Sequence, residues 1–433
     1  MSRITTSQLP HHVGQTIELK GWLHRLRRLR NISFLILRDR TGLAQIVVED
    51  DSTLLLLDQL PAESVLTVWG VVIAVEQAPN GVEIHHPTVS VLSRAVEPPP
   101  FDLYRPALKA QLPTILDHAP VALRHATLSS TWKIAASAMA GFRQALTDEQ
   151  FVEIQTPKIV AAATESGANV FKIDYFDTPA FLAQSPQFYK QMMVGVYERV
   201  FEVGPVFRAE PHATTRHLAQ YTSLDAEIGF IEDHHTVMAL LTRVLAEMMA
   251  CVQRERALDL DRLEVELPQV PAAIPSIHFR DAHELYFQAT GEDVRAEPDL
   301  TPAQERWLGE WAQAEFQSAF LFVVGYPMIK RPFYTHADPQ QPEYSNSFDL
   351  LFRGVELVTG GQRLHHYADY LTALAVRGLS PEAFKEYLSV FKHGMPPHGG
   401  FAIGLERFVA RLTGAKNVRE VALFPRDMTR LTP

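Results

Sequence analysis

VFEVGPVFRAEP, residues 200–211, is the stretch of this chain on which the fold depends. Apolar and polar residues alternate along it, a pattern that is typical of a half-buried strand. Side chains two residues apart on a strand point to the same face, so Arg208 and Glu210 should emerge together. The stretch therefore predicts a strand that ends in an arginine and a glutamate able to share one ligand.

Composition sets the class of protein to which this strand belongs. The 433 residues suffice for two or three domains, and 46% hydrophobic residues can fill packed cores. The N-terminal MSRITTSQLPHHVGQ lacks the apolar core of a signal peptide, and no window approaches the roughly 18 uninterrupted apolar residues of a membrane helix. The only cysteine, Cys251, excludes an internal disulfide or a cysteine zinc cluster, and the paired histidines lack metal-ligand spacing. We expect a globular cytoplasmic protein without a membrane anchor.

The N-terminal part, residues 1–97, reads as five short strands with turn signals between them and little helix. This pattern favours a five-stranded OB-fold β-barrel, a common binder of single-stranded nucleic acid. The net charge of the chain is -10, yet residues 20–40 hold seven basic residues against one acid. Trp22 and Phe34 lie among these cations, where aromatic rings can stack on unpaired bases. The segment predicts a barrel that binds a polyanion.

A linker and a second domain follow the barrel. Three consecutive prolines, Pro98 to Pro100, open a hinge or linker that we place at 98–126. Apolar residues then recur at three and four positions from Leu128 to Leu146, which predicts a helix of about five turns. Strands alternate with further helical segments beyond it. Residues 127–433 are therefore expected to form an α+β domain on a mostly antiparallel sheet.

A hairpin in this domain brings two acids together. Arg353-Gly354 in SFDLLFRGVELVTGG can close a turn that pairs Leu351 with Glu356. Asp349 and Glu356 would then share a face, roughly 7–8 Å apart between Cα atoms. Two carboxylates so placed can hold a hard cation such as Mg²⁺ together with phosphate oxygens, although a pair of exposed acids on an edge strand is the plainer interpretation.

Three motifs together carry a resemblance to a known family. They are FVEIQTP at 151–157, FRAE at 207–210, and GLER at 404–407, which places Arg407 in the first turn of a helix where amides and dipole favour phosphate. In order and context they are similar to motifs one, two and three of the class II aminoacyl-tRNA synthetases. The chain resembles the aspartate group of that class from the barrel to FPRDMTRLTP at 424–433. Without a large insertion between motifs two and three, it is similar to the compact archaeal type.

The resemblance implies an ATP site. Arg208 would hold the α-phosphate and the amino acid carboxylate, Glu210 would accept from the adenine amino group, and Tyr221 would stack on the ring. His217 would face the outer phosphates. The implied ATP residues are Arg208, Glu210, Arg216, His217, Leu218, Tyr221, Glu356, Gly404, Leu405, Glu406 and Arg407, of which Arg208, Arg407 and Glu356 would be catalytic. The implied Mg²⁺ ligands are Glu356, Asp349 and Thr359.

The resemblance also implies which amino acid is activated. Lys190 in QSPQFYKQ and Arg363 in GGQR would grip a side-chain carboxylate. An uncharged asparagine would leave a buried cation unpaired, so aspartate is favoured. Ser185, Gln187 and Asp225 would take the α-ammonium group, and Glu165 matches a mobile loop. The implied aspartate residues are Glu165, Ser185, Gln187, Lys190, Arg208, Asp225, Thr359 and Arg363.

The expected partners are a second copy of the chain and transfer RNA. Members of the family are homodimers with motif one at the interface, which would place Pro157 near a two-fold axis. The implied anticodon residues are His24, Arg25, Arg27, Phe34, Gln45 and Pro79. Compact enzymes that reject tRNA(Asn) carry tryptophan at the position of His24 and lysine near that of Pro79. The chain is thus expected to load aspartate onto both tRNA(Asp) and tRNA(Asn), which links it to an aspartyl-tRNA amidotransferase.

Four alternatives remain beside this expectation. They are an aspartyl enzyme that discriminates between the two tRNAs, an asparaginyl-tRNA synthetase, an aspartate-adenylating amide ligase and a non-catalytic RNA-binding paralogue. An amide ligase does not need the barrel of residues 1–97, and a paralogue would have lost the motif arginines, whereas Arg208 and Arg407 are present.

Overall fold

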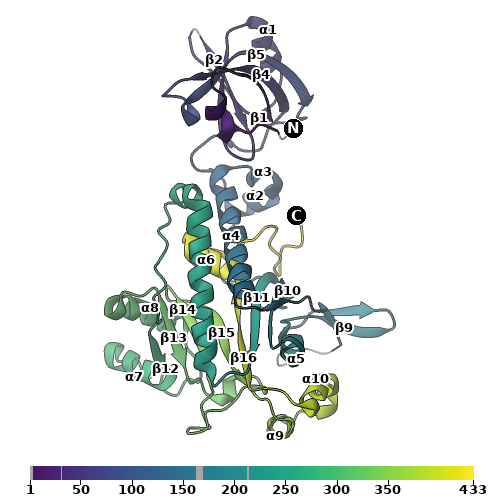
Figure 1. Ribbon diagram of the computed structural model, residues 1–433, viewed down its shortest axis with the longest axis vertical. Coiled ribbons are helices and arrows are strands. Elements are labelled where there is room, and N and C mark those ends of the chain that lie inside the picture. The colour runs from purple at the N-terminus through teal and green to yellow at the C-terminus, as the bar shows by residue number, and fades with distance from the viewer. Residues whose placement is uncertain (1–2, 31, 162–168, 212–213) are drawn as a thin grey trace. The chain divides into compact units, whose positions relative to one another are not determined.

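The structure is a computed structural model that describes residues 3–30, 32–161, 169–211 and 214–433. The chain separates into two compact units, Met1–Ala126 and Thr127–Pro433. Each unit has a sheet of its own (Figure 1).

The N-terminal unit is built on a closed five-stranded barrel in the order β1-β2-β3-β5-β4. Its interior is filled by alternate residues of each strand, such as Leu35 and Leu37 of β2, because side chains on a strand alternate between faces. The expected OB-fold barrel is confirmed. The strands are β1 Thr16–Arg28, β2 Ser33–Arg38, β3 Leu43–Val48, β4 Val65–Ala74 and β5 Val82–Ser93. The unit also contains the helices η1 Thr6–His12, α1 Asp51–Asp58, η2 Pro79–Gly81, α2 Leu112–Asp117 and α3 Ala119–Ala122.

The second unit is organised around an eight-stranded sheet in the order β12-β13-β14-β15-β16-β11-β10-β6. Its five central pairings, from β13 to β10, are all antiparallel. The strands are β6 Val152–Glu153, β10 Arg199–Phe207, β11 Gln220–Gly229, β12 Ser276–His278, β13 Phe320–Val324, β14 Ser347–Phe352, β15 Glu356–Arg363 and β16 His398–Gly404. A small sheet of β7 Ile159–Val160, β9 Thr178–Leu182 and β8 Lys172–Tyr175 adds a projecting hairpin (Figure 1). The mostly antiparallel α+β domain is confirmed.

Two long helices, α4 Ala126–Asp148 and α6 His234–Arg262, lie side by side along the sheet (Figure 1). Gly141 permits their close contact, since a Cβ there would lie 2.8 Å from the Cα of Met248. Helix α6 is long and apolar enough to cross a membrane by length and composition alone, but 61% of its most apolar window is buried inside the protein, as in a core helix. The other helices are α5 Gln187–Tyr197, α7 Phe279–Thr290, α8 Pro302–Phe316, α9 Tyr367–Val376, α10 Lys385–Ser389, α11 Leu405–Thr413, η3 Met328–Lys330, η4 Pro381–Phe384, η5 Val390–His393 and η6 Val418–Val421.

The predicted hairpin is confirmed, with one irregularity. Leu351 pairs with Glu356 as expected, but a bulge then shifts the register, so that Asp349 faces Thr359.

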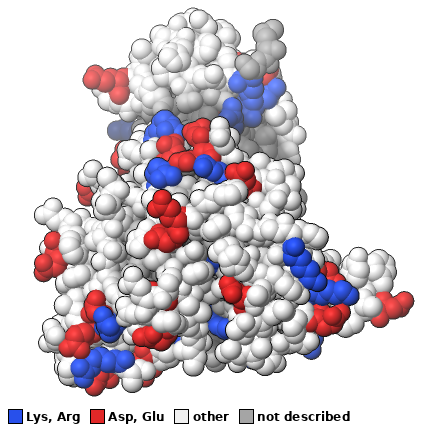
Figure 2. All heavy atoms as spheres, turned by 60° about the horizontal axis from the view of Figure 1, so that its bottom comes forward, with Lys and Arg blue, Asp and Glu red and all other residues white. Residues whose placement is uncertain are grey.

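On the surface of the second unit, acidic and basic side chains lie in mixed clusters on the face shown in Figure 2.

Candidate active site

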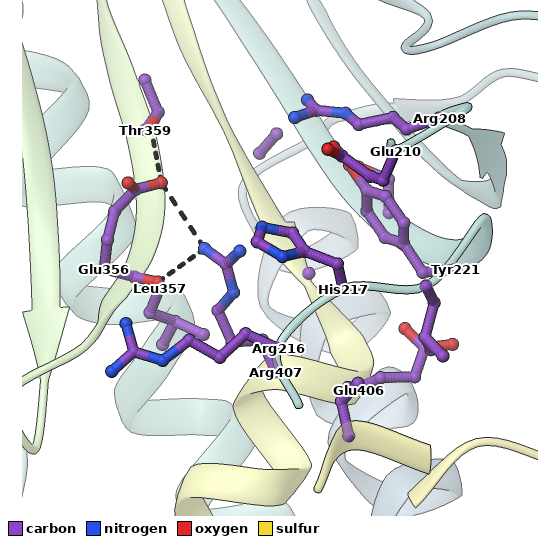
Figure 3. A pocket seen from close by; sticks show the side chains of 15 residues that line it. Arg208, Glu210, Arg216, His217, Tyr221, Glu356, Leu357, Thr359, Glu406 and Arg407 are labelled. Carbon is purple, nitrogen blue, oxygen red and sulfur yellow. Dashed lines mark hydrogen bonds and ion pairs between the residues drawn. The ribbon is translucent and has the colours of Figure 1, made fainter. Parts of the chain in front are cut away.

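A cavity opens where β10, β11, β15 and β16 meet the N-terminus of α11 (Figure 3). Arg208 and Glu210 follow the end of β10 and both line this cavity, as the alternation of the strand predicts. The backbone amide of Arg208 donates to the carbonyl of Ala219 at 2.9 Å, so the strand pairing continues to this point. The guanidinium carbon of Arg208 lies 5.9 Å from the ring centre of Tyr221. The cavity thus combines a cation, an acceptor and an aromatic platform.

The opposite wall carries Arg407 and Glu356. Arg407 Nη1 donates to the backbone carbonyl of Glu356 at 2.8 Å and lies 3.6 Å from its carboxylate Oε1. The hydroxyl of Thr359 donates to that same Oε1 at 3.3 Å. These contacts, drawn in Figure 3, join the first turn of α11 to β15 and point one arginine into the cavity.

A third group of residues comes from the loop before β11. Arg216 Nη1 lies 3.6 Å from Glu305 Oε2, and His217 Nδ1 is 2.7 Å from the hydroxyl of Thr214. Burial lowers the pKa of His217; the charge of Glu210 opposes this fall and the surrounding arginines add to it. The imidazole is therefore mostly neutral at neutral pH, and negative phosphate groups beside it would favour its protonation.

Two of the residues implied for ATP have structural roles. Leu405 is 1% exposed, belongs to the hydrophobic core and does not line the cavity. Glu406 lines the cavity, and its two carboxylate oxygens accept from the backbone amide of Thr222 at 3.1 and 3.0 Å. Burial raises the pKa of Glu406 to about 7. Glu406 thus fastens the start of α11 to β11.

The residues implied for Mg²⁺ differ in their surroundings. Glu356 is 41% exposed in its side chain and, with Thr359, offers the hard oxygen ligands that this ion prefers. Asp349 is buried, and its Oδ1 accepts from Arg331 Nη2 at 3.0 Å. Burial raises the pKa of Asp349 to about 6, with Arg331 opposing the rise and Glu356 adding to it. Glu356 and Thr359 fit a magnesium site once Thr359 turns its hydroxyl hydrogen away from Glu356 Oε1, whereas Asp349 would have to give up its contact with Arg331.

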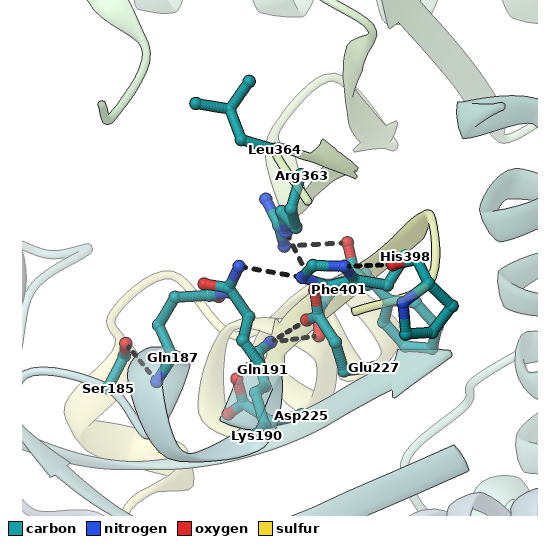
Figure 4. A network of polar contacts seen from close by, with 12 residues as sticks. Ser185, Gln187, Lys190, Gln191, Asp225, Glu227, Arg363, Leu364, His398 and Phe401 are labelled. Carbon is teal, nitrogen blue, oxygen red and sulfur yellow. Dashed lines mark hydrogen bonds and ion pairs between the residues drawn. The ribbon is translucent and has the colours of Figure 1, made fainter. Parts of the chain in front are cut away.

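A second cluster, shown in Figure 4, surrounds Lys190 of α5. This lysine is 1% exposed. Its ammonium group donates to Asp225 Oδ1 at 2.9 Å and to the carbonyl of Phe401 at 3.2 Å, and it lies 3.4 Å from Glu227 Oε2. Asp225 also accepts from the hydroxyl of Ser223, a residue that lines the cavity of Arg208 and Arg407. The buried charges therefore adjoin that cavity along β11.

Arg363 of β15 completes this cluster from the other side. Its Nε donates to Glu227 Oε1 at 3.0 Å and its Nη2 donates to the carbonyl of Gly400 at 3.0 Å. Although burial alone would raise the pKa of Glu227, the charges of Arg363 and Lys190 hold it below the usual value. Only glycine fits at 400, because a Cβ there would lie 2.1 Å from Glu227 Oε2. The structure thus brings Lys190 and Arg363 to one carboxylate of the protein itself, that of Glu227.

Behind these charges lies a polar network that the sequence analysis missed. Gln191 Nε2 donates to the hydroxyl of Tyr370 at 3.3 Å and is 3.1 Å from His398 Nε2, while the hydroxyl of Tyr387 donates to Gln191 Oε1 at 3.1 Å. Gln187 Nε2 donates to the same Oε1 at 2.9 Å. Gln187 and Gln191 are one turn apart on α5, but nothing in the local sequence pairs Gln191 with Tyr370, Tyr387 or His398, which are far from it along the chain.

The remaining residues of the implied aspartate site have few side-chain contacts or lie outside the described residues. Ser185 Oγ accepts from the backbone amide of Gln187 at 3.1 Å, at the start of α5. Glu165 lies outside the described residues. Glu227 was missed, although its spacing of two residues from Asp225 on one strand was a signal that both carboxylates share a face.

One group resembles a metal site by spacing. The potential ligand atoms of Asp233, His234 and His235 lie within 4.8 Å of one another, although the paired histidines were expected to lack such spacing. A carboxylate oxygen of Asp233 accepts from the backbone amide of His235 at 2.7 Å, which is the ordinary N-cap contact of α6. The cap explains this arrangement without a metal.

On the barrel, residues implied for the anticodon lie on β1 and β2. Arg27 pairs directly with Phe34, and the guanidinium of Arg25 lies 4.2 Å from the ring centre of Tyr104. Arg27 is exposed, Phe34 is half-buried, and Pro79 is exposed in the connection from β4 to β5. A cation and an aromatic ring therefore stand side by side on this surface.

Two further residues implied for the anticodon lie against acidic side chains. Gln45 Nε2 donates to Glu83 Oε1 at 2.6 Å. His24 is 9% exposed in its side chain, and its Nδ1 lies 3.7 Å from Glu63 Oε1. The other carboxylate oxygen of Glu63 accepts from Arg38 at 2.6 Å. His24 thus lies beside the buried ion pair of Glu63 and Arg38.

Comparisons with known proteins agree with both units. The family described as tRNA synthetases class II (D, K and N) matches residues 112–428, and the OB-fold nucleic acid binding domain matches residues 17–92. An aspartate–tRNA(Asp/Asn) ligase of Thermus thermophilus is 45% identical over 100% of both chains. An aspartate–tRNA(Asp) ligase of Thermococcus kodakarensis is 40% identical over 97% of both. The crystal structure of asparaginyl-tRNA synthetase from Pyrococcus horikoshii with asparaginyl-adenylate covers 100% of both chains with a TM-score of 0.93 and 30% identity.

Proposed function

Because this chain belongs to the class II tRNA synthetases of the aspartate, lysine and asparagine group, we propose that it activates L-aspartate with ATP and transfers the aspartyl group to tRNA. The observation that carries the choice of amino acid is the pair of buried cations, Lys190 and Arg363, beside the nucleotide cavity. The contacts of Arg363 within the described part of the chain use Nε and Nη2, which leaves Nη1 to meet a substrate carboxylate.

The chemistry requires cations rather than a protein nucleophile. An oxygen of the aspartate α-carboxylate attacks the α-phosphorus, the bond to the bridging oxygen breaks, and pyrophosphate leaves with the electron pair. Negative charge accumulates on the reacting phosphorus group and on pyrophosphate, so positioning and electrostatic stabilisation supply the catalysis. Arg208 would face the first of these groups, while Arg407, Arg216 and His217 would face the outer phosphates; all four line the cavity. A ribose hydroxyl of tRNA then attacks the aspartyl carbonyl and releases AMP.

Mg²⁺ would be held by Glu356 and Thr359, with Asp349 joining if it exchanges Arg331 for the ion. When bound, the ion would neutralise part of the phosphate charge. Glu356 would then have two roles. Its carboxylate would bind the ion, and its backbone carbonyl holds Arg407 in place.

Charge separates aspartate from asparagine in this proposal. The fold does not, because the Pyrococcus asparaginyl enzyme has nearly the same backbone. An asparagine amide cannot offer the charge-assisted acceptor that Lys190 and Arg363 favour. A site that binds a charged group rejects the neutral analogue because its own buried groups are left poorly paired. The asparaginyl alternative is therefore the less favoured one.

For the tRNA, we infer that the enzyme accepts both tRNA(Asp) and tRNA(Asn). The name of the Thermus relative, which includes both tRNAs, supports this inference. The name of the Thermococcus relative includes only tRNA(Asp), so an enzyme that discriminates between the two tRNAs is the alternative. Aspartyl-tRNA(Asn) would then need an amidotransferase to become asparaginyl-tRNA. We place the reaction in the cytoplasm, where protein synthesis consumes its product.

We also propose a homodimer with Pro157 near the two-fold axis. Only two residues of motif one, Val152–Glu153, form a strand, and Ile154 continues the pairing by donating to the carbonyl of Phe201. Sedimentation equilibrium should give twice the chain mass of 48.7 kDa at micromolar concentration. A monomer would contradict the dimer.

The decisive experiment is aspartate-dependent exchange of labelled pyrophosphate into ATP, with and without tRNA. We expect exchange with aspartate but little with asparagine. Arg208→Ala and Arg407→Ala should each lower the rate by at least about 10²-fold, since each removes a cation from the transition state. A variant within about threefold of the wild type would contradict the assignment, because a catalytic cation contributes more than that.

A further inference from the structure

A second cavity lies between α8, the turn from β14 to β15, and α11. Its charged lining is Arg306 and Glu310 of α8, Arg353 of the turn, and Arg411 of α11, so three cations face one acid. Gln313 adds an amide to the same wall. A cavity with this net positive charge suits an anion.

The floor of this cavity is held rigidly. Backbones meet where α8 crosses the turn, since a Cβ on Gly309 would lie 2.5 Å from the Cα of Gly354. The guanidinium of Arg353 donates to the last carbonyls of α11, those of Arg411 and Leu412, at 3.0 and 3.2 Å, and to the carbonyl of Glu266 at 3.1 Å. Carbonyl oxygens fix the position of this guanidinium but do not neutralise its charge.

The other two arginines have side chains available for a ligand. Within the described residues, neither Arg306 nor Arg411 has an ion pair or a side-chain hydrogen bond; Arg306 is exposed and Arg411 is half-buried. Burial lowers the pKa of Arg411, and the neighbouring charges of Arg216, Arg407 and Arg306 lower it further, against Glu305. Three arginines around one acid, Glu310, leave an excess of positive charge that a bound anion would offset.

This cavity lies close to the outer-phosphate side of the nucleotide cavity. Arg407 and Arg411 are one turn apart on α11, so they lie on the same side of that helix. Glu305, which pairs with Arg216 of the nucleotide cavity, directly precedes Arg306. Arginines therefore continue from the wall shown in Figure 3 to the second cavity.

We propose that the second cavity is a binding site for inorganic pyrophosphate, separate from the nucleotide cavity, in which Arg306, Arg353 and Arg411 hold the anion. The identity of the anion rests on the proposed function, because adenylation releases one pyrophosphate beside Arg407. Guanidinium groups bind phosphate oxygens with two parallel hydrogen bonds, and three of them match the charge of this product.

The test is calorimetric titration of the full-length protein with pyrophosphate while a non-hydrolysable ATP analogue fills the nucleotide cavity. We expect the wild type to bind pyrophosphate under these conditions. Arg306→Gln combined with Arg411→Gln should weaken this binding by at least about tenfold, because charged hydrogen bonds are lost. The matched control is Arg280→Gln on α7, an exposed arginine 3.5 Å from its neighbour Asp281; it should change the binding by less than about twofold, since distant surface charges are screened.

Three results would overturn the proposal: no binding by the analogue-filled wild type, equal loss in the Arg280 control, or unchanged pyrophosphate binding in the double variant. If the double variant instead raises the KM for tRNA while pyrophosphate binding is unchanged, the cavity serves RNA phosphates. Failure of aspartate-dependent exchange would remove the proposed function but leave the titration intact, so the two failures are distinguishable.

Discussion

At the scale of single residues, the amino acid pocket that we propose depends on compensated charge. Lys190 and Arg363 are both buried, and each has a carboxylate within 3.0 Å before any substrate is present. A buried charge without such a partner would cost several kcal/mol, so Asp225 and Glu227 keep the two cations in place. The substrate carboxylate then adds to an existing network rather than creating one.

Replacing Lys190 by leucine should affect aspartate far more than ATP. The substitution removes the ammonium group that lies 2.9 Å from Asp225, and Lys190 does not itself line the nucleotide cavity. We expect the KM for aspartate to rise at least about 10²-fold, in line with loss of a buried charged hydrogen bond, and the KM for ATP to stay within a few fold. Pyrophosphate exchange at varied concentrations of each substrate measures both. Equal losses would show that the pocket is misplaced.

Glu406 gives a prediction about pH and stability. Its pKa rises from 4.5 to about 7 on folding, so the folded protein binds a proton more tightly than the unfolded chain. The stabilising effect of that proton is complete below the unfolded value and is lost as the pH rises through about 7. Glu406→Gln stays neutral and can still accept from Thr222, so its advantage over the wild type should grow between pH 5 and pH 8 by roughly 3 kcal/mol.

Urea denaturation of both proteins at several pH values, followed by a signal from the catalytic unit, measures this difference. The gap between the two midpoints is the relevant quantity, because other groups titrate equally in both proteins. A gap that stays constant from pH 5 to pH 8 would show that the carboxyl group is ionised throughout.

At the scale of elements, the period of the sequence predicted strands and helices well where local pattern and tertiary contact agree. The alternation before Arg208 predicted β10, and the turn at Arg353-Gly354 predicted the pairing of Leu351 with Glu356. The bulge that follows was not predictable, because nothing in the local sequence shows that the register shifts and sets Asp349 opposite Thr359. Local pattern therefore located the hairpin but not the partner of its buried acid.

Long-range contacts limited the prediction of the site in the same way. The resemblance to a family identified Lys190 and Arg363, but not the chain of polar contacts from Gln191 to His398. Nor did it show that Asp349 is paired with Arg331, a residue in an irregular segment without a motif. Such partners become visible only when distant segments are brought together by the sheet.

Strand β16 carries the third prediction. A Cβ added to Gly400 would lie 2.1 Å from the carbonyl of Ala226 and 2.1 Å from Glu227 Oε2. Gly400→Ala should therefore displace Glu227 and, through it, Arg363, and raise the KM for aspartate about tenfold or more, since small misplacements of binding groups are costly. The KM for ATP reports on the nucleotide cavity and should change much less. An unchanged KM for aspartate would mean that β16 and β11 move apart to admit the methyl group without displacing Glu227.

At the scale of the whole molecule, the two units divide recognition between them. The catalytic unit contains both cavities and the cluster around Lys190 and Arg363, whereas the barrel carries an exposed Arg27 paired with a half-buried Phe34. Fewer of the basic side chains in residues 20–40 are available to bind RNA than the composition suggests, because Lys20, Arg28 and Arg38 pair with acids. RNA binding by the barrel therefore depends on a few cations and on stacking.

The breadth of tRNA recognition is the last prediction. His24 and Pro79 replace the tryptophan and lysine expected in enzymes that reject tRNA(Asn), so aspartate should be loaded onto both transcripts. Here His24 is held against Glu63, and Glu63 keeps Arg38 and Arg124 as partners if the imidazole is removed. We therefore expect His24→Trp to fold, with the larger ring turned toward the barrel surface because Glu63 and its arginines occupy the space beneath it.

Charging of each purified transcript with labelled aspartate decides the question. We expect the wild type to prefer tRNA(Asp) by well under about 10³-fold, because one base-specific contact contributes roughly 1–3 kcal/mol. His24→Trp combined with Pro79→Lys should restore a marked preference, since the lysine adds a charge and an amide donor that proline lacks. Pro79→Ala is the matched control, because it restores the amide without the charge. A wild-type preference above about 10³-fold would reject dual recognition, since one missing base contact could not coexist with such selectivity.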